Sequence, residues 1–540
     1  MRSIIIPLLV ISGALQAQPA ADAQRLSDHI RILASDDFEG RAPGTAGETR
    51  TLDYLARQFG TIGLTPAGDR GGWTQQVPLR RFEVTGQVRS QFTVQRRTRP
   101  LTEFDDIVVF TKTPVRKIDV VRAPLVFVGF GIRAPERHWD DFKGFDLKGK
   151  VALILVNDPG FEQAPKALTY YGRWTYKLEE AARRGALGAL LIHDTAAAGY
   201  GWDTVRNSFS VPQYDLVEDN PMAAQPRVRG WLRHEIAAEL FASAGLDLDA
   251  EQRHAHEAGF RPIELAGVTF STHFAVNTRI TLSHNFIGKL VGSQHPDEAV
   301  LFSAHWDHLG VGPADAQGDR IFNGALDNAS GVACVLELAR LFASSAPTQR
   351  SVYFINFTAE EKGDLGSRFY ANHPLTSLGK TVALLNIDGA NLKGPTRDVS
   401  SRGGPLNSPL DDLLALEAGA AGRQFVTDPA LEQGYFFRAD QFSLARVGVP
   451  ALGYAAGLDL EEGGVAAGNA WAADYLAHRY HQPADEWRAD LDLRGAVADT
   501  MIYYSLGRRL ADSRVWPAWK PGSPFKGIRD QTAIDRSNTR

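Results

Sequence analysis

The strongest constraint on the fold is a series of short apolar runs in the second half of the chain, separated by helical patterns. The runs cover residues 300–303, 352–357, 382–387 and 450–454. Apolar runs of this length that alternate with helices are typical of parallel strands buried on both faces. The pattern therefore predicts an α/β core, in which helices cover both faces of a mixed, mostly parallel sheet.

Acids and histidines stand where these predicted strands end. His305 and Asp307 follow the first run. Glu360 and Glu361 follow the second run, and Asp388 closes the third. Because open α/β sheets bind ligands at the carboxyl ends of their strands, we expect these side chains to meet at one edge of the sheet. Buried acids gathered in this way repel one another unless cations lie among them.

Two further segments extend this candidate metal site. Asp327 opens a predicted helix, where its alternative role is that of an N-cap. His481 follows Tyr480 in a turn-rich segment and offers a second imidazole. Imidazole and carboxylate groups are the ligands that zinc takes. We also expect Asp307 to accept a hydrogen bond from the ring nitrogen of His305 that faces away from the metal.

A smaller α/β unit is predicted in the first half of the chain. Strand-like runs cover residues 125–130, 151–156 and 189–193, and a helical pattern covers residues 177–184. Strand, helix and strand in this spacing indicate an inserted α/β module. Its aromatic residues are expected either to line the substrate approach or to form the module's core; they are Tyr170, Tyr171, Trp174 and Tyr176.

The chain has 540 residues, more than one hydrophobic core usually serves. Residues 279–282 and 286–291 are expected to form two adjacent strands, and the C-terminal residues an extended, partly docked tail. We divide the chain into a signal peptide at 1–17, an N-terminal part of the main domain at 18–115, the insert at 116–265, the core at 266–510 and the tail at 511–540.

Composition and the first residues bear on partners and location. A net charge of -5 and a pI near 6.3 offer no basic face for nucleic acid. The apolar run from Ile4 to Leu15 is too short to span a bilayer, so it predicts a cleaved signal peptide and no stable membrane span. The single cysteine, Cys334, forms no intramolecular disulfide. These features predict export to a bacterial periplasm or to the medium.

The site segments resemble, in order and spacing, the successive motifs of the M28 metallopeptidases, a family that includes bacterial leucyl-type aminopeptidases. The residues that carry this resemblance are His305-Trp306-Asp307-His308, Leu326-Asp327-Asn328-Ala329-Ser330-Gly331, Thr358-Ala359-Glu360-Glu361, Asn386-Ile387-Asp388 and Tyr480-His481. The loop from Glu39 to Gly44 is similar to an N-terminal loop of the same family. Residues 116–265 resemble a protease-associated (PA) domain, with Gly149-Lys150-Val151 among the matching residues.

The resemblance implies a zinc-exopeptidase-like fold with two zinc ions per chain. Asp327 would bridge the two ions. His305 and Asp388 would complete one site, and Glu361 and His481 would complete the other. Zinc suits these ligands, although cobalt or manganese also binds such groups.

The resemblance further implies hydrolysis of N-terminal peptide bonds in peptide substrates. Glu360 would be the general base that activates a metal-bridging water, and Tyr480 a hydrogen-bond donor to the tetrahedral oxyanion. The alternatives are a carboxypeptidase, a single-zinc glutaminyl cyclase and a metal-free binding domain. The complete set of five ligands argues against the last two. The sequence sets neither the preferred N-terminal residue nor the oligomeric state.

Overall fold

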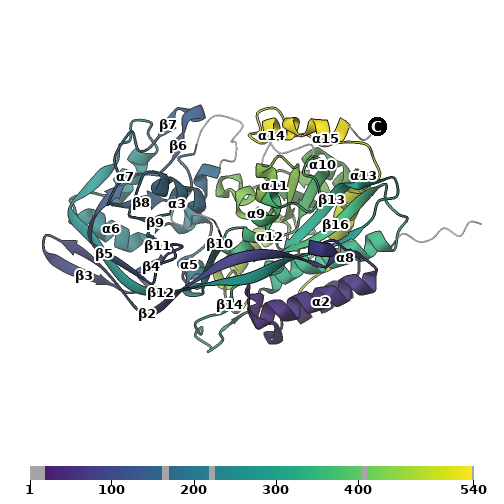
Figure 1. Cartoon of the computed structure of the whole chain (residues 1–540), viewed down its shortest axis with the longest axis horizontal. Coiled ribbons are helices and arrows are strands. Elements are labelled where there is room, and N and C mark those ends of the chain that lie inside the picture. The colour runs from purple at the N-terminus through teal and green to yellow at the C-terminus, as the bar shows by residue number, and fades with distance from the viewer. Residues whose placement is uncertain (1–18, 161–169, 218–224, 404–409, 538–540) are drawn as a thin grey trace, which may run out of the picture.

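The computed structural model describes residues 19–160, 170–217, 225–403 and 410–537, which form a larger and a smaller lobe joined by two long strands (Figure 1). The predicted signal peptide lies outside the described residues. The joining strands are β2 (Thr74–Val94) and β12 (Ile263–Leu290), which pair antiparallel along most of their length. The insert is therefore connected to the rest of the molecule by continuous sheet.

The larger lobe contains the mixed, mostly parallel sheet that the apolar runs predict. Its central strands are parallel, in the order β20-β17-β13-β16, and β12 joins β16 antiparallel. The bounds are β13 (His295–His305), β16 (Arg350–Phe357), β17 (Thr381–Asn386) and β20 (Ala451–Ala456), with β18 (Asp398–Arg402) and β19 (Gln424–Val426) at the edge.

Helices cover both faces of this sheet, which explains why its strands are apolar throughout. Alternate residues point to opposite faces of a strand, so Phe302 packs in one core and Leu301 in the other. One face packs against α1 (Ala23–Leu33), α2 (Ala46–Ile62), α8 (Gly331–Ala343), α10 (Leu410–Ala420) and α13 (Arg494–Ala511). The other face packs against α9 (Leu365–Asn372) and α11 (Gln441–Arg446).

The strands of the smaller lobe continue the same sheet beyond β12, and this lobe has its own apolar cores. Its parallel strands are β5 (Lys117–Phe127), β8 (Val151–Leu155), β9 (Gly188–His193) and β11 (Val228–Arg233), and β4 (Ile107–Phe110) adds an antiparallel edge. Its helices are α3 (Trp174–Arg183), α4 (Thr195–Ala198), α5 (Trp202–Ser210), α6 (His234–Ser243) and α7 (Leu248–Ala255). The boundaries at 116 and 265 stay a prediction, and β4 lies before the first of them.

Two expectations about individual elements are wrong. Residues 279–282 and 286–291 are not separate strands, because β12 runs through the polar residues between them. Ser283 and Asn285 are tolerated there because each makes side-chain hydrogen bonds inside the protein. The C-terminal tail is partly helical rather than extended, with α14 (Lys526–Gln531) and α15 (Ala533–Ser537). Trp519, which is only 2% exposed, docks the tail on the larger lobe.

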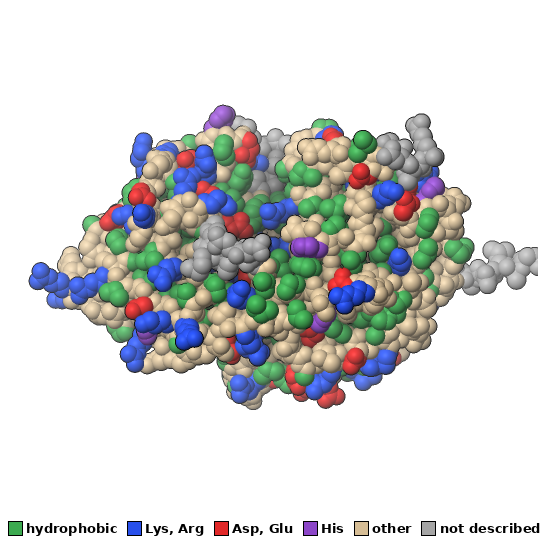
Figure 2. All heavy atoms as spheres, viewed as in Figure 1, with side chains coloured by type: hydrophobic (Ala, Val, Ile, Leu, Met, Phe, Trp, Pro, Cys, Tyr) green, Lys and Arg blue, Asp and Glu red, His purple; other side chains and the backbone are tan. Residues whose placement is uncertain are grey.

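The surface carries charges of both signs. On the face shown in Figure 2, Lys and Arg side chains are interspersed with Asp and Glu side chains. Within the ranges that the structure describes, no helix combines the length and the apolar character needed to cross a bilayer.

Arg41 ties the N-terminal loop to the segments that carry the candidate ligands. Its side chain is 1% exposed and donates hydrogen bonds to four backbone carbonyls. They belong to Leu33, Trp306, Asn323 and Gly324, at distances of 2.6–2.9 Å. Burial lowers the pKa of Arg41 to about 10, so the guanidinium is charged at neutral pH.

Replacing Arg41 is expected to destabilise the protein strongly. In Arg41→Met the four carbonyls lose the guanidinium as a donor; that of Gly324 still accepts from the N–H of Ala329. Each of the other three becomes a buried acceptor without a partner, at a cost of about 1–3 kcal/mol. We therefore expect a loss of at least about 3 kcal/mol in the free energy of unfolding, measured by urea denaturation. Arg31→Ala is the control, because Arg31 makes an exposed ion pair with Asp28 and should cost less than about 1 kcal/mol. Equal losses in the two variants would contradict the anchoring role of Arg41.

Candidate metal centre

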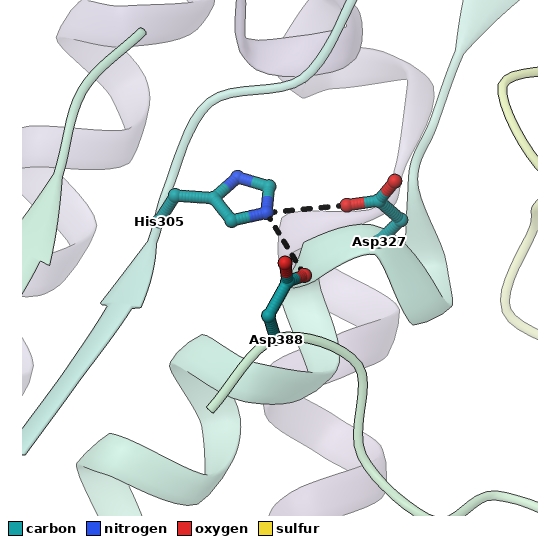
Figure 3. A group of neighbouring side chains, drawn as sticks. All are labelled: His305, Asp327 and Asp388. Atoms are coloured by element: carbon teal, nitrogen blue, oxygen red, sulfur yellow. Dashed lines mark hydrogen bonds and ion pairs between the residues drawn. The ribbon is translucent and has the colours of Figure 1, made fainter. Parts of the chain in front are cut away.

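Three of the predicted ligands meet at the carboxyl edge of the larger sheet. His305 ends β13, Asp388 follows β17, and Asp327 lies in the turn before α8 (Figure 3). The Nε2 atom of His305 lies 3.2 Å from Oδ1 of Asp327 and 3.3 Å from Oδ1 of Asp388. Figure 3 shows both carboxylates directed toward this ring nitrogen. One imidazole and two carboxylates thus converge on one point.

A second group forms around the other oxygen of Asp327. The Nε2 atom of His481 lies 3.3 Å from Oδ2 of Asp327 and 3.1 Å from Oε2 of Glu361. Nδ1 of His308 lies 2.5 Å from Oε1 of Glu361. Asp327 therefore presents one carboxylate oxygen to each group, as a bridging ligand does.

The turn that carries Asp327 is fixed from two sides. Both carboxylate oxygens of Asp485 accept hydrogen bonds from backbone N–H groups, those of Leu326 and Asp327, each at 3.1 Å. The Asn328 side chain accepts a hydrogen bond from the N–H of Gly389. It also donates one to the carbonyl of Ile387. Asn328 thus links the turn directly to the loop that carries Asp388.

Gly324 begins this turn, with a φ of +58°, in the left-handed region. A Cβ atom added there would lie 2.1 Å from the carbonyl oxygen of Asp327 and 2.7 Å from the ring of His308. Only glycine fits at such a close approach.

The expected hydrogen bond between His305 and the Asp307 carboxylate is not formed. Nδ1 of His305 lies 3.0 Å from the main-chain carbonyl oxygen of Asp307 but 3.9 Å from its Oδ1. That carboxylate oxygen accepts a hydrogen bond from the N–H of Glu360 instead, at 3.1 Å. The turn after β13 brings the carbonyl closer to the ring than the side chain. Asp307 consequently positions the segment of Glu360 as well as the His305 ring.

Glu360 and Glu361 have different surroundings, although they are neighbours in sequence. Glu361 faces the imidazoles of His308 and His481. Glu360 is buried and interacts with Asp364 rather than with an imidazole of the second group. Burial, together with the nearby charges of Asp364 and Asp388, raises the pKa of Glu360 well above its ordinary value. Such a carboxyl group readily accepts and holds a proton.

The candidate ligands form ion pairs, in which the imidazoles are positively charged and the carboxylates negatively charged. Burial opposes charge on His481, but Glu361 and Asp327 outweigh it and raise the pKa of His481 to about 9. Burial and Glu361 oppose the charge of Asp327, but hydrogen bonds from His305 and His481 lower its pKa. Three carboxylates, those of Asp327, Glu361 and Asp388, and three imidazoles, those of His305, His308 and His481, thus share a buried space. This donor set fits zinc, which binds imidazole nitrogen and carboxylate oxygen.

A cavity of 440 Å³ opens onto these groups and lies between the lobes. Asp327, Glu360, Asp388 and His481 are at its wall, and residues of the smaller lobe form another part of it. Aromatic and cationic side chains line the remainder, among them Trp174, Lys393, Arg402, Arg438, Trp471 and Tyr480.

Tyr480 borders the cavity next to a candidate ligand, since its ring centroid lies 4.0 Å from that of His481. Burial, then the charges of Asp327 and Glu361, raise the pKa of Tyr480 well above its ordinary value. The hydroxyl group therefore keeps its proton and remains a donor.

The four aromatic residues of the insert divide between the two expected roles. Trp174 lines the cavity. Tyr176 is 6% exposed in the core of the smaller lobe, and Tyr171 packs against its ring. Tyr170 contacts the ring of Phe442 in the larger lobe. The hypothesis of a common substrate-lining role is therefore wrong for Tyr176, whose size suits the core.

Sequence reasoning missed two residues that shape the centre. His308 belongs to the segment that carries the first ligand, and Asp485 follows the last ligand by four positions. The turn signal of Pro483 marks the segment of Asp485, but nothing in the sequence shows that its carboxylate reaches the Asp327 turn. Both contacts depend on the folded chain.

The metal-free protein is expected to lose stability as the pH rises from about 4 to about 9. Burial raises the pKa of Asp307 from 3.8 to about 7, and the neighbouring acids raise that of His481 from 6.5 to about 9. Each group binds its proton more tightly when folded, so its stabilisation is complete below the unfolded pKa and is lost as the pH rises through the folded pKa.

Thermal unfolding of chelator-treated protein at about pH 5, 7 and 9 measures this decline. Added zinc should restore the stability most at the alkaline end, because its ligands must be deprotonated. A melting temperature of the metal-free protein that rises with pH would contradict the assignment.

Comparison with known proteins supports the zinc assignment. Residues 285–505 match the family described as Peptidase family M28. A probable zinc metalloprotease of Pyrenophora tritici-repentis is 38% identical over 115 residues, which is 21% of this chain and 26% of that protein. Aminopeptidase YwaD of Bacillus subtilis is 40% identical over 93 residues, which is 17% of this chain and 18% of that protein. The matches thus span about a quarter or less of these relatives.

Solved structures share the fold over nearly the whole chain. An aminopeptidase from Aneurinibacillus sp. strain AM-1 superposes with a TM-score of 0.55 at 19% identity, covering 93% of this chain and 97% of that one. BSAP, a zinc aminopeptidase from Bacillus subtilis, gives 0.50 at 18% identity, covering 95% and 98%. The region at 285–505 that matches peptidase family M28 holds every candidate ligand.

Proposed function

We propose that this protein is a two-zinc aminopeptidase that hydrolyses N-terminal peptide bonds. The observation that carries the proposal is the shared carboxylate of Asp327, whose two oxygens face two separate groups of ligands. His305 and Asp388 complete one group, and Glu361 and His481 complete the other. These residues would hold the two ions, which when bound would supply Lewis-acid chemistry for peptide hydrolysis.

Glu360 is the proposed general base. It borders the cavity and is not needed as a ligand. Its raised pKa lets the carboxylate take a proton from the attacking water and hold it until the amine leaves. The same proton then passes to the leaving nitrogen, which returns Glu360 to its charged form.

Tyr480 is the proposed donor to the oxyanion that develops on the substrate. Its hydroxyl group keeps its proton because burial, and then the acids nearby, raise its pKa. A donor placed at developing negative charge stabilises the transition state more than the substrate.

Aminopeptidase action is favoured over the alternatives by the relatives, since aminopeptidases occur among both the sequence and the structural matches. Carboxypeptidase and glutaminyl cyclase activities use related metal chemistry and are outcomes of the tests below. We further propose that the smaller lobe is a PA-type domain, that peptides are the substrates and that the protein is exported.

Two neighbouring variants separate catalysis from metal binding. Glu360→Gln should keep both zinc ions and its fold while losing about 10²–10⁴-fold in kcat. Glu361→Gln should lose zinc from one site, because Glu361 is a proposed ligand beside His481. The measurements are zinc content by elemental analysis and hydrolysis of aminoacyl-p-nitroanilides with and without chelator. Full activity in Glu360→Gln would refute its role as the base.

The same assay distinguishes the kinds of exopeptidase. N-acetylated versions of the substrates should not be cleaved, because an aminopeptidase requires a free α-amine. Cleavage of an N-acetylated peptide from its carboxyl end would indicate a carboxypeptidase. Formation of pyroglutamate from a peptide with N-terminal glutamine would indicate a cyclase.

Tyr480→Phe should lower kcat by about 10²–10³-fold, as the loss of an oxyanion donor does. KM and zinc content should change little, because the ring and its packing against His481 are kept. Steady-state kinetics of the variant and the wild type provide the measurement. A changed KM with unchanged kcat would assign Tyr480 to substrate binding instead.

A further inference from the structure

A helix of the smaller lobe reaches the metal centre of the larger lobe. The helix is α5, and its residue Ser208 has its Oγ atom 2.6 Å from Nδ1 of His481. The two residues are 273 positions apart in the chain. The Nε2 atom of the same imidazole faces Asp327 and Glu361.

The hydrogen bonds of Ser208 determine which ring nitrogen of His481 carries the proton. Oγ of Ser208 lies 2.7 Å from the carbonyl oxygen of Thr204, one helical turn earlier. A carbonyl oxygen only accepts, so the single hydroxyl hydrogen of Ser208 is donated to it. Ser208 Oγ must then accept a hydrogen bond from Nδ1–H of His481. In the neutral ring, which is the form that binds a metal, this tautomer leaves the lone pair on Nε2.

The same helix also supports the backbone of His481. His481 has a φ of +55°, an unfavourable conformation for a residue with a side chain. The Asn207 side chain donates a hydrogen bond of 2.8 Å to its carbonyl oxygen. Consecutive residues of α5 therefore hold both the ring and the main chain of this ligand.

The end of α5 is itself anchored close to the ligands. Gln213 donates a side-chain hydrogen bond of 2.9 Å to the carbonyl oxygen of Ser208. Nζ of Lys362, the residue after Glu361, lies 3.4 Å from the same oxygen. Lys362 is itself a hydrogen-bond acceptor, since Lys112 donates to its carbonyl oxygen at 3.1 Å. These contacts fix the end of α5 against the segment that carries Glu361.

We propose that Ser208 and Asn207 of the insert are positioning residues for the zinc site formed by His481, Glu361 and Asp327. Ser208 sets the tautomer and the orientation of the His481 ring, and Asn207 holds its backbone. The inference rests on the proposed function only in that zinc binds this group. It makes the insert part of the metal centre, whatever substrate the enzyme takes.

The test is the zinc affinity of each site in Ser208→Ala. Groups that orient a metal-binding histidine typically contribute about 10–100-fold to metal affinity. Competition with a chromophoric zinc chelator should therefore show one of the two sites weakened by about 10–100-fold and the other unchanged. Ser208→Thr keeps a hydroxyl group and should restore the affinity. Asn207→Ala should weaken the same site.

Ser210→Ala is the matched control. Ser210 lies on the same helix, and its hydroxyl group donates a hydrogen bond of 3.0 Å to the carbonyl of Asn207, not to His481. This variant should bind zinc as the wild type does. The melting temperature of each metal-free variant shows whether a lost affinity reflects lost folding. A variant Ser208→Ala that is folded and binds both ions with wild-type affinity would overturn the proposal.

The outcome is distinguishable from a failure of the proposed function. A wild type that binds two zinc ions with the expected dependence on Ser208, but cleaves no peptide, would reject the aminopeptidase and keep the positioning role. A wild type that binds no zinc at all would reject both.

Discussion

The structure depends on one constraint, the gathering of four carboxylates at the edge of a buried sheet. Asp327, Glu360, Glu361 and Asp388 repel one another, and burial strengthens the repulsion. The surrounding chain counters it with hydrogen-bonded imidazoles and with rigid turns. The backbone around Asp327 is accordingly held by Asp485, Asn328 and Arg41, each through several hydrogen bonds. Much of the larger lobe serves to keep these charges in place.

The sequence predicts the larger lobe well because each parallel strand is covered on both faces. An apolar run followed by an acid, as at Phe357 and Glu360, therefore marks both a buried strand and its carboxyl end. The acids converge because these parallel strands are neighbours in one sheet and end at the same edge of it. The first helix shows the other kind of pattern, since Leu26, Ile30 and Leu33 of α1 recur at helical spacing and are buried.

Other features depend on contacts between distant segments and leave little trace in the sequence. Polar residues such as Ser283 look like a turn until their buried partners are known. Ser208 looks like an ordinary helix residue, because its partner His481 lies in another lobe. The position of Asp307 after a strand places it correctly at the site, but the geometry of the turn gives its carboxylate a different partner from the one expected.

The shared strand β12 gives the two lobes a common frame. It pairs with β5 of the smaller lobe near its start and with β16 of the larger lobe at its end. Each residue advances a strand by about 3.3 Å, and a shift of one residue turns every side chain to the opposite face. Insertions or deletions in β12 would consequently move α5 along the sheet or turn it away from His481. The number of residues in β12 thus sets the distance between the two lobes. Natural insertions and deletions should be confined to the loops on either side of this strand.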